Sequence, residues 1–233
     1  SLLATFSRGN FARRVFFSGS HRSELVNGLY AKFSFDFSDR LPIENMTFAD
    51  WSNELFGELN LPTDFEEYTV ALVAVDLLYR HKQRYILKGN RKLILGSEYP
   101  DVRLKLSRGI PDFMGSDVDY SHLELSMMQD VNWPRMGYTY WRAGGGSFFT
   151  DDYSKVKLIE HRYFRGSDKG LFSDPLTSLQ TLQGSYHTPK SYMELYVIHH
   201  FEGALLKWVP LINRMNLELA VGNGAVWTEE FGP

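Results

Sequence analysis

Apolar and polar residues alternate along several stretches of this chain, and the clearest of them covers residues 29–38. Polar residues and Tyr30 occupy one face, and the other face is apolar throughout: Leu29, Ala31, Phe33, Phe35 and Phe37. A period of two residues is typical of a β-strand with one apolar face. Asn27 and Gly28 come just before, and this dipeptide is a strong signal for a hairpin turn. The sequence therefore predicts a β-hairpin at residues 27–28.

Similar patterns predict further strands along most of the chain. Residues 68–80 are apolar on both faces apart from Asp76, which predicts a strand that is covered on both sides or pressed against a neighbour. Residues 85–95 are basic and contain Gly89 and Asn90, which favours a bulged strand or a loop. The other predicted strands cover residues 15–25, 102–107, 120–128, 137–149, 191–201 and 215–227.

The alternation alone leaves open what covers the apolar faces. A strand of about 9–11 tilted residues crosses a lipid bilayer, and the alternating stretch 29–38 has that length. A long strand in a soluble β-sandwich would show the same pattern. The aromatic content of 15% favours a transmembrane barrel, because such barrels carry aromatic residues at both lipid interfaces.

Residues 42–66 break the β pattern. Thr47 and Asp50 resemble a capping box, and the apolar residues that follow have helical spacing. We predict a short amphipathic helix in a surface loop. Its side chains Phe48, Trp51 and Phe56 would be available to bind a partner or a membrane surface. Alternatively, the same side chains only hold the loop against the rest of the fold.

Composition excludes several classes of function. The net charge of −3 disfavours a nucleic-acid-binding protein, for which a basic excess is expected. The chain has no cysteine, so disulfides, thiolate catalysis and cysteine-ligated metals are excluded. No run of about 18 apolar residues occurs, which disfavours a transmembrane helix. We expect the chain to be a piece of a larger protein.

Several short motifs give only weak chemical signals. His199 and His200 are adjacent, and neighbouring strand residues point to opposite faces, so the pair is poorly placed to bind one metal ion, even with Glu202 or His187 nearby. The three glycines at 144–146 lack the residues of a phosphate loop and favour close backbone approach or strong curvature. The acidic pair at 117 and 119 lacks EF-hand spacing. No nucleophile elbow is present, and we predict no catalytic residue, metal or cofactor.

Four motifs together resemble an uncharacterised family of outer-membrane β-barrel proteins of gram-negative bacteria: residues 95–100, 115–120, 164–168 and 194–203. The likeness extends over nearly the whole chain, and the last motif, with its His-His-Phe-x-Gly pattern, is the most specific. Members of that family commonly carry an N-terminal carboxypeptidase-regulatory-like domain, which this sequence does not contain. The resemblance implies a location and an architecture, and it implies no enzymatic reaction.

The closing part is also distantly similar to the surface-antigen barrels that insert or translocate polypeptides at the outer membrane. In those barrels an arginine at a loop tip reaches into the lumen and meets an acidic residue. The tip would correspond here to residues 161–178, with Phe164, Arg165, Gly166 and Asp168. Gly222 occupies the position where an acidic residue is expected, so the resemblance leaves Glu194 or Glu218 as partners of Arg165.

We therefore expect an all-β fold: a single antiparallel transmembrane β-barrel domain over residues 1–233, present in part, with about 14 to 16 strands when complete. The leading function is a non-enzymatic outer-membrane barrel of the assembly or translocation type, or a subunit of a larger outer-membrane complex. The alternatives are a scaffold barrel that binds lipoproteins or transporters without a pore function, and a soluble all-β binding module. The expected partners are outer-membrane lipids and other outer-membrane proteins or lipoproteins, and no nucleic acid.

Overall fold

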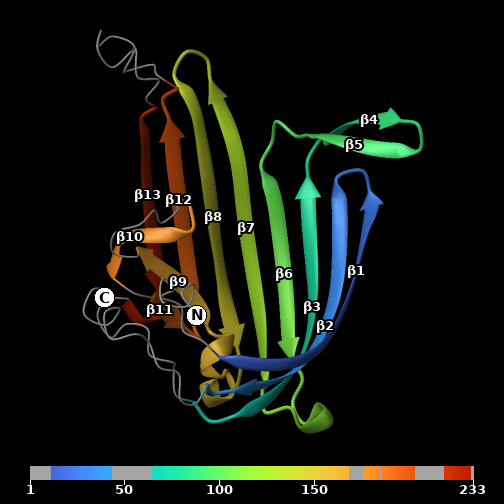
Figure 1. Cartoon of the computed structure of the whole chain (residues 1–233), viewed down its shortest axis with the longest axis vertical. Helices are drawn as coiled ribbons and strands as arrows, with labels where there is room; N and C mark the ends of the chain where they lie inside the picture. The colour runs from blue at the N-terminus through green and yellow to red at the C-terminus, as the bar shows by residue number, and fades with distance from the viewer. Residues whose placement is uncertain (1–11, 44–64, 168–175, 184, 203–217, 232–233) are drawn as a thin grey trace.

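The computed structural model describes residues 12–43, 65–167, 176–183, 185–202 and 218–231. Its main body is one antiparallel sheet of eight strands, which curves strongly across its width (Figure 1). From edge to edge the strands are β1 (Arg13–Val26), β2 (Leu29–Leu41), β3 (Tyr68–Arg80), β6 (Asp101–Gly109), β7 (Tyr120–Trp133), β8 (Gly137–Phe149), β12 (Tyr192–His200) and β13 (Ala220–Thr228).

The remaining strands form two small sheets. β4 (Arg84–Lys88) and β5 (Arg91–Gly96) make a hairpin between β3 and β6. Between β8 and β12 the chain forms β9 (Arg162–Ser167), which pairs with β10 (Ser178–Gln183) in parallel and with β11 (Ser185–Thr188) antiparallel. Four short 3-10 helices complete the described structure: η1 (Phe113–Gly115), η2 (Tyr153–Lys155), η3 (Leu158–Glu160) and η6 (Glu229–Phe231). We call the described residues of 153–188 the inserted segment.

The eight-stranded sheet has two faces of opposite character. We call the face that carries Tyr30, Tyr120 and Tyr192 the inner face, because the inserted segment packs against it. The opposite, outer face is mainly apolar, and most of it is uncovered in the part of the chain that the structure describes, apart from the region where Phe113 of η1 lies edge-on to Phe35. Its exposed side chains include Phe33, Val75, Leu104, Leu106, Leu123, Leu125, Met127, Met193, Leu195 and Val221.

The packed core lies on the inner face, near the end of the sheet where β3, β7 and β12 begin. Five inner-face residues meet Val156 and Phe164 of the inserted segment and Val118 of the turn before β7; these five are Tyr68, Val70, Tyr120, Phe148 and Tyr192. The ring of Phe164 is 1% exposed and lies edge-on to Tyr192, with 5.5 Å between ring centroids. The sheet therefore folds around a segment of its own chain.

Local sequence signals explain the turns that set the register. Gly28 has a φ of 87°, and a Cβ at this position would lie 2.4 Å from the carbonyl oxygen of Arg80. The Arg80 amide also donates to the Gly28 carbonyl at 2.7 Å. Glycine is therefore needed twice at this hairpin, for its conformation and for the approach of β3.

Most strand predictions are confirmed, with two corrections. β8 covers Gly137–Phe149 and β3 covers Tyr68–Arg80, as expected, while residues 84–96 form a hairpin with Gly89 and Asn90 at its turn. The prediction that residues 68–80 are covered on both sides is wrong for the second half of β3, because its outer-face residues are uncovered. Val75 is 39% and Tyr79 is 43% exposed.

The sheet is open in the described residues, with β1 and β13 as its two edges, and the expected closed barrel is not seen among them. The helix predicted within residues 42–66 lies almost entirely outside the described residues. None of the helices in the described part of the chain is long and apolar enough to span a membrane.

Gly146 provides a test of the packing on the inner face. A Cβ at this position would lie 2.7 Å from both the Leu123 carbonyl oxygen and the Tyr192 hydroxyl. We expect Gly146→Ala to lower the free energy of unfolding by about 1–3 kcal/mol, the usual cost of overpacking. Gly19→Ala is the control, because a Cβ there meets nothing within 4 Å. Equal chemical denaturation midpoints for the two variants would contradict this packing.

Candidate functional site on the inner face

The inserted segment is held on the inner face by a buried carboxylate shared between two arginines. Glu194 points inward from β12, and its side chain is 3% exposed. Arg162 at the start of β9 donates from Nη2 to both Oε1 and Oε2 of Glu194 at 2.9 Å. Arg142 on β8 donates to Oε1 at 2.8 Å. Glu124 also lies close enough to act on Arg162, so the cluster balances two partly exposed arginines against two carboxylates.

Neighbouring groups shape this cluster. Gly144 lies opposite Glu194 on β8, and a Cβ at Gly144 would come within 3.5 Å of Glu194 Oε1. The guanidinium of Arg162 also lies over the rings of Phe164 and Tyr192, at 5.7 and 5.4 Å from their centroids. Its Nε is buried without a hydrogen-bond partner among the described residues. The site therefore combines charge pairing, aromatic packing and one unused donor.

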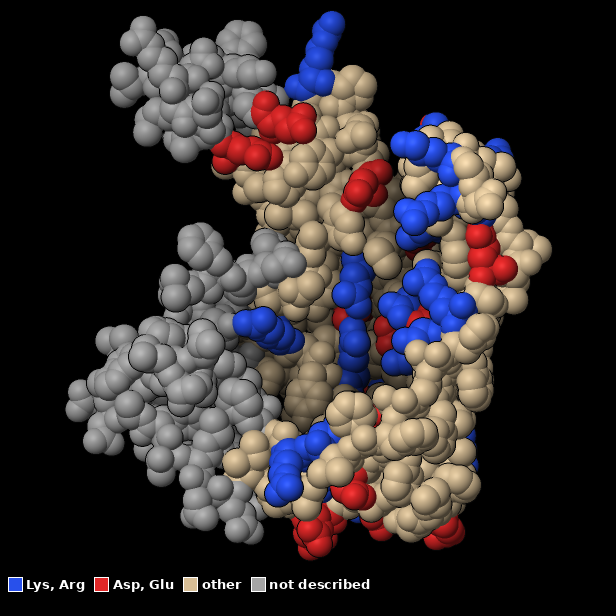
Figure 2. All heavy atoms as spheres, turned by 45° about the vertical axis from the view of Figure 1, so that its right-hand side comes forward, with Lys and Arg blue, Asp and Glu red and all other residues tan. Residues whose placement is uncertain are grey.

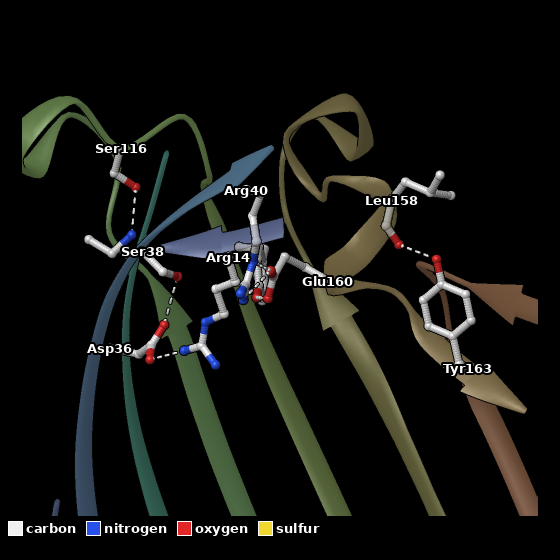
Figure 3. A network of polar contacts seen from close by, with 10 residues as sticks. Arg14, Asp36, Ser38, Arg40, Ser116, Leu158, Glu160 and Tyr163 are labelled. Atoms are coloured by element: carbon white, nitrogen blue, oxygen red, sulfur yellow. Dashed lines mark hydrogen bonds and ion pairs between the residues drawn. The ribbon is translucent and has the colours of Figure 1, made fainter. Parts of the chain in front are cut away.

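A second ion pair fastens the same segment to the other side of the sheet. Glu160, at the end of η3, accepts from both Nε and Nη2 of Arg40 on β2, at 3.0 and 2.9 Å. Tyr120 on β7 donates to the other carboxylate oxygen at 3.4 Å. Figure 3 shows Arg40 and Glu160 pointing toward one another beside β2. Both side chains of the pair are nearly buried, at 12% and 9% exposure.

These two contacts form what we call the brace: Arg40–Glu160 and Arg162–Glu194. Glu160 and Arg162 are two residues apart in the inserted segment, yet they bind β2 and β12, the strands next to the two opposite edges of the sheet. The charges are arranged in opposite senses, since the segment supplies the acid on one side and the base on the other. Such an arrangement fixes the direction in which the segment can lie across the inner face.

The rest of the inner face carries further charged residues. Asp76 on β3 pairs with Arg103 on β6, and Arg80 donates to Asp101 at 2.7 Å. Arg14 on β1 pairs with Asp36 on β2, as Figure 3 shows. In the space-filling view the molecule is hollowed, with Lys and Arg side chains inside the hollow and acidic side chains beside them (Figure 2).

Two histidines contact each other within the inserted segment, with their rings tilted by 52°. The Nδ1 atoms of His161 and His187 are 3.0 Å apart, and His161 Nε2 lies 2.9 Å from the Val156 carbonyl oxygen. The carbonyl oxygen can only accept a hydrogen bond, so Nε2 carries the proton, and Nδ1 of neutral His161 is left to accept from His187. Burial, and to a smaller extent His187, lowers the pKa of His161 below its usual value.

The structure places the predicted loop residues in β9. Phe164 and Gly166 are buried, and Arg165 is exposed on the strand between them. Asp168 lies outside the described residues. Glu194 binds Arg142 on β8 and Arg162, which lies three residues before Arg165. Glu218 lies elsewhere, beside His200 Nδ1 at 3.0 Å.

The other residues singled out from the sequence do not form a common site in the described part of the chain. Phe48, Trp51 and Phe56 lie outside the described residues. The ring nitrogens of His199 contact Thr139 and the Met136 carbonyl, whereas His200 stacks on Tyr138, so the adjacent histidines point to different partners. In the described part of the chain no group of three or more His, Asp or Glu side chains is placed to hold a metal ion.

Sequence reasoning missed three residues of the brace, Arg40, Glu160 and Arg162, and also Arg142, which shares Glu194 with Arg162. A charged residue on an otherwise aromatic face was the available signal for Arg142 and Glu194, which lie on neighbouring strands. Their pairing with residues 160 and 162 depends on how the sheet curves, which alternation does not encode.

Comparison with protein families gives a clear result. A family model described as "Family of unknown function (DUF5686) C-terminal domain" matches residues 2–233. The chain belongs to this family. No curated protein matches the chain. The match includes the eight-stranded sheet, the inserted segment and the β4–β5 hairpin. The description of the family names no reaction.

The brace predicts a large cost for losing its shared carboxylate. Glu194→Gln removes the carboxylate that Arg142 and Arg162 share, and breaking a buried pair in this way costs about 3–5 kcal/mol. Glu98→Gln is the control, because Glu98 and its partner Arg84 are 74% and 61% exposed; such a pair contributes about 0–1 kcal/mol. Chemical denaturation should separate the two variants, and similar midpoints would show that Glu194 is not a structural anchor.

The histidine pair predicts a dependence on pH. The pKa of His161 in the folded chain lies below its usual value of 6.5, so the folded state binds fewer protons. Stability from this group is therefore full above that value and is lost as pH falls below it. Limited proteolysis within residues 153–188 should accelerate at about pH 5.5. His161→Gln should remove the histidine-dependent part of this change, whereas substitution of exposed His21 should leave it; an unchanged profile in His161→Gln would refute the assignment.

Proposed function

We propose that this domain is part of the wall of a non-enzymatic outer-membrane β-barrel, of the assembly or translocation type or a subunit of a larger outer-membrane complex. The observation that carries the proposal is the polarity of the eight-stranded sheet. Its exposed outer face is apolar, with Leu125 49% and Leu195 46% exposed, while ion pairs lie on its inner face. A water-soluble sheet normally has the opposite arrangement, with its apolar face packed on a core.

Aromatic side chains near the strand ends support the same proposal. Tyr79 and Trp133 stand near the ends of β3 and β7 at one end of the sheet, and Phe149 and Trp227 near the ends of β8 and β13 at the other. The exposed side chains between them in the middle of the strands are mainly aliphatic. Transmembrane barrels have this distribution, with aromatic girdles at both lipid interfaces and an apolar band about 25 Å tall between them.

The strand lengths are compatible with this role. β1, β2, β3, β7 and β8 have 13 or 14 residues. About 9–11 residues suffice to cross the hydrocarbon region when a strand is tilted. Each of these strands is therefore long enough to cross it and to extend into both interfaces.

The packed inner core favours a second candidate function. Phe164 and Val156 fill part of the inner face together with Tyr120, Phe148 and Tyr192, and the brace fixes the inserted segment there. A barrel whose interior is occupied in this way suits a scaffold that binds lipoproteins or transporters without a pore of its own. Single-channel conductance of the reconstituted protein distinguishes the two candidates, because only a translocation barrel needs a path through its interior.

An outward charge tests whether lipid covers the outer face. Leu125 lies near the middle of β7, and we expect Leu125→Arg to reduce the stability of the protein folded into liposomes by about 2–4 kcal/mol, the cost near the bilayer midplane. Met136→Arg is the control, because Met136 is 56% exposed but lies in the turn between β7 and β8. If both variants fold into liposomes like the unchanged protein, or if the chain folds and stays soluble without detergent, the membrane role is excluded and a soluble binding module remains.

A further inference from the structure

The β4–β5 hairpin combines exposed apolar side chains with a concentrated positive charge. Six of its apolar residues are 42–71% exposed: Tyr85, Ile86, Leu87, Leu93, Ile94 and Leu95. Residues 84–96 also contain four basic residues and no acidic one, although the chain as a whole has a net charge of −3. A hairpin in water would normally keep at least one face polar, so this composition indicates a different surrounding.

The two faces of the hairpin are both amphipathic. Tyr85, Leu87 and Ile94 share one face with Lys92, and Ile86 and Leu93 share the other with Lys88 and Arg91. Lys88 and Arg91 flank the turn, and no ion pair is found for either within the described residues. The apolar side chains thus lie along the hairpin, while unpaired positive charge gathers at its tip.

The base of the hairpin is fixed to the sheet. Gln83 accepts from the Tyr30 hydroxyl at 3.0 Å and donates to Asn27 at 3.1 Å, both from the β1–β2 hairpin. Lys92 pairs with Glu24 on β1 and lies 4.5 Å from the centroid of Tyr85. β4 and β5 pair only with each other in the described structure. Lys92 directly follows Arg91, so the hairpin is held at its base through Gln83 and near its tip through Lys92.

The position of the hairpin agrees with its composition. It leaves the sheet at the end where β3 finishes, and it lies across the direction of the long strands in Figure 1. The exposed aromatic residues Tyr79, Tyr99 and Trp133 lie in the segments at this same end. Under the proposed function this is the level of the lipid headgroups, where a segment lying across the strands runs along the membrane surface.

We propose that the β4–β5 hairpin lies in the headgroup layer and binds anionic lipid, with Lys88 and Arg91 on the lipid phosphates and the apolar side chains against the upper acyl chains. Basic residues near an anionic surface contribute about 1 kcal/mol each, and apolar burial at the interface adds to this. This inference rests on the proposed function for the level at which the hairpin lies, but its lipid specificity can be tested separately.

The test uses a fluorescent label at the tip. The chain has no cysteine, so Asn90→Cys supplies a single attachment point for an environment-sensitive dye at an exposed turn position. The labelled full chain in neutral detergent is titrated with phosphatidylglycerol, with phosphatidylcholine and with inorganic phosphate. We expect a blue shift of the dye emission with phosphatidylglycerol that salt weakens, and little response to the other two.

Charge removal identifies the residues responsible. Lys88→Gln combined with Arg91→Gln should weaken the apparent affinity for phosphatidylglycerol about 25-fold, because each basic residue accounts for about fivefold. Arg13→Gln combined with Lys155→Gln is the matched control, since both residues are exposed and lie at the other end of the strands. It should leave the titration unchanged.

The outcomes separate this inference from the proposed function. Equal responses to the two lipids, a response to inorganic phosphate alone, or equal effects of both double variants would overturn the headgroup role. Normal folding of the Lys88 and Arg91 variant into zwitterionic liposomes is expected, because the outer face and not the hairpin holds the barrel in the membrane. If Leu125→Arg leaves the stability in liposomes unchanged, the proposed membrane role is excluded. The titration still shows whether the hairpin binds phosphatidylglycerol.

Discussion

The structure depends on two ion pairs that hold one segment against strands near both edges of a curved sheet. The segment supplies the acidic residue to one pair and the basic residue to the other. Glu160 binds Arg40 on β2, and Arg162 binds Glu194 on β12, from positions two residues apart. An uncompensated buried charge is costly, so neither contact is easily given up once the segment is seated. Because β2 and β12 are separated in the sheet by β3, β6, β7 and β8, this single attachment constrains the curvature of all of them.

The contrast between the two faces follows from this arrangement. Charged side chains on the inner face are stable there because they find counter-charges across neighbouring strands, as Asp76 does with Arg103 and Asp101 with Arg80. Pairing inward leaves the outer face free of charge over the middle of the strands, where Leu104, Leu123 and Leu125 lie. The curved sheet therefore encloses the charged side chains on its inner face and leaves apolar side chains on its outer face. The proposed function places lipid against this outer face.

Much of the fold could be predicted from the sequence, and little of the site. Strict alternation located β2 and the Asn27–Gly28 turn, because side-chain period and turn chemistry are local properties. The same logic predicted too much cover for Val75 and Tyr79, since an apolar run does not reveal whether a neighbour exists. Glu194 and Glu218 were the expected partners of Arg165, and the structure instead shows Arg162 and Arg142 at Glu194. The approach of these two arginines depends on curvature and on close packing at Gly144, which emerge only when distant strands meet.

The open edges of the sheet place a physical requirement on the proposed function. β1 and β13 each present one side without a strand partner in the described structure, and unpaired backbone groups are not tolerated in hydrocarbon. If lipid surrounds the outer face, both edges must be paired by further strands, from this protein or from another chain, and the expectation of about 14 to 16 strands remains a prediction of that kind. The brace lies between these edges on the inner face, so it can hold the curvature of the eight strands whichever strands complete the wall. Closure of the wall therefore depends on strands that pair with β1 and β13, whereas the curvature of the eight strands is held by the brace.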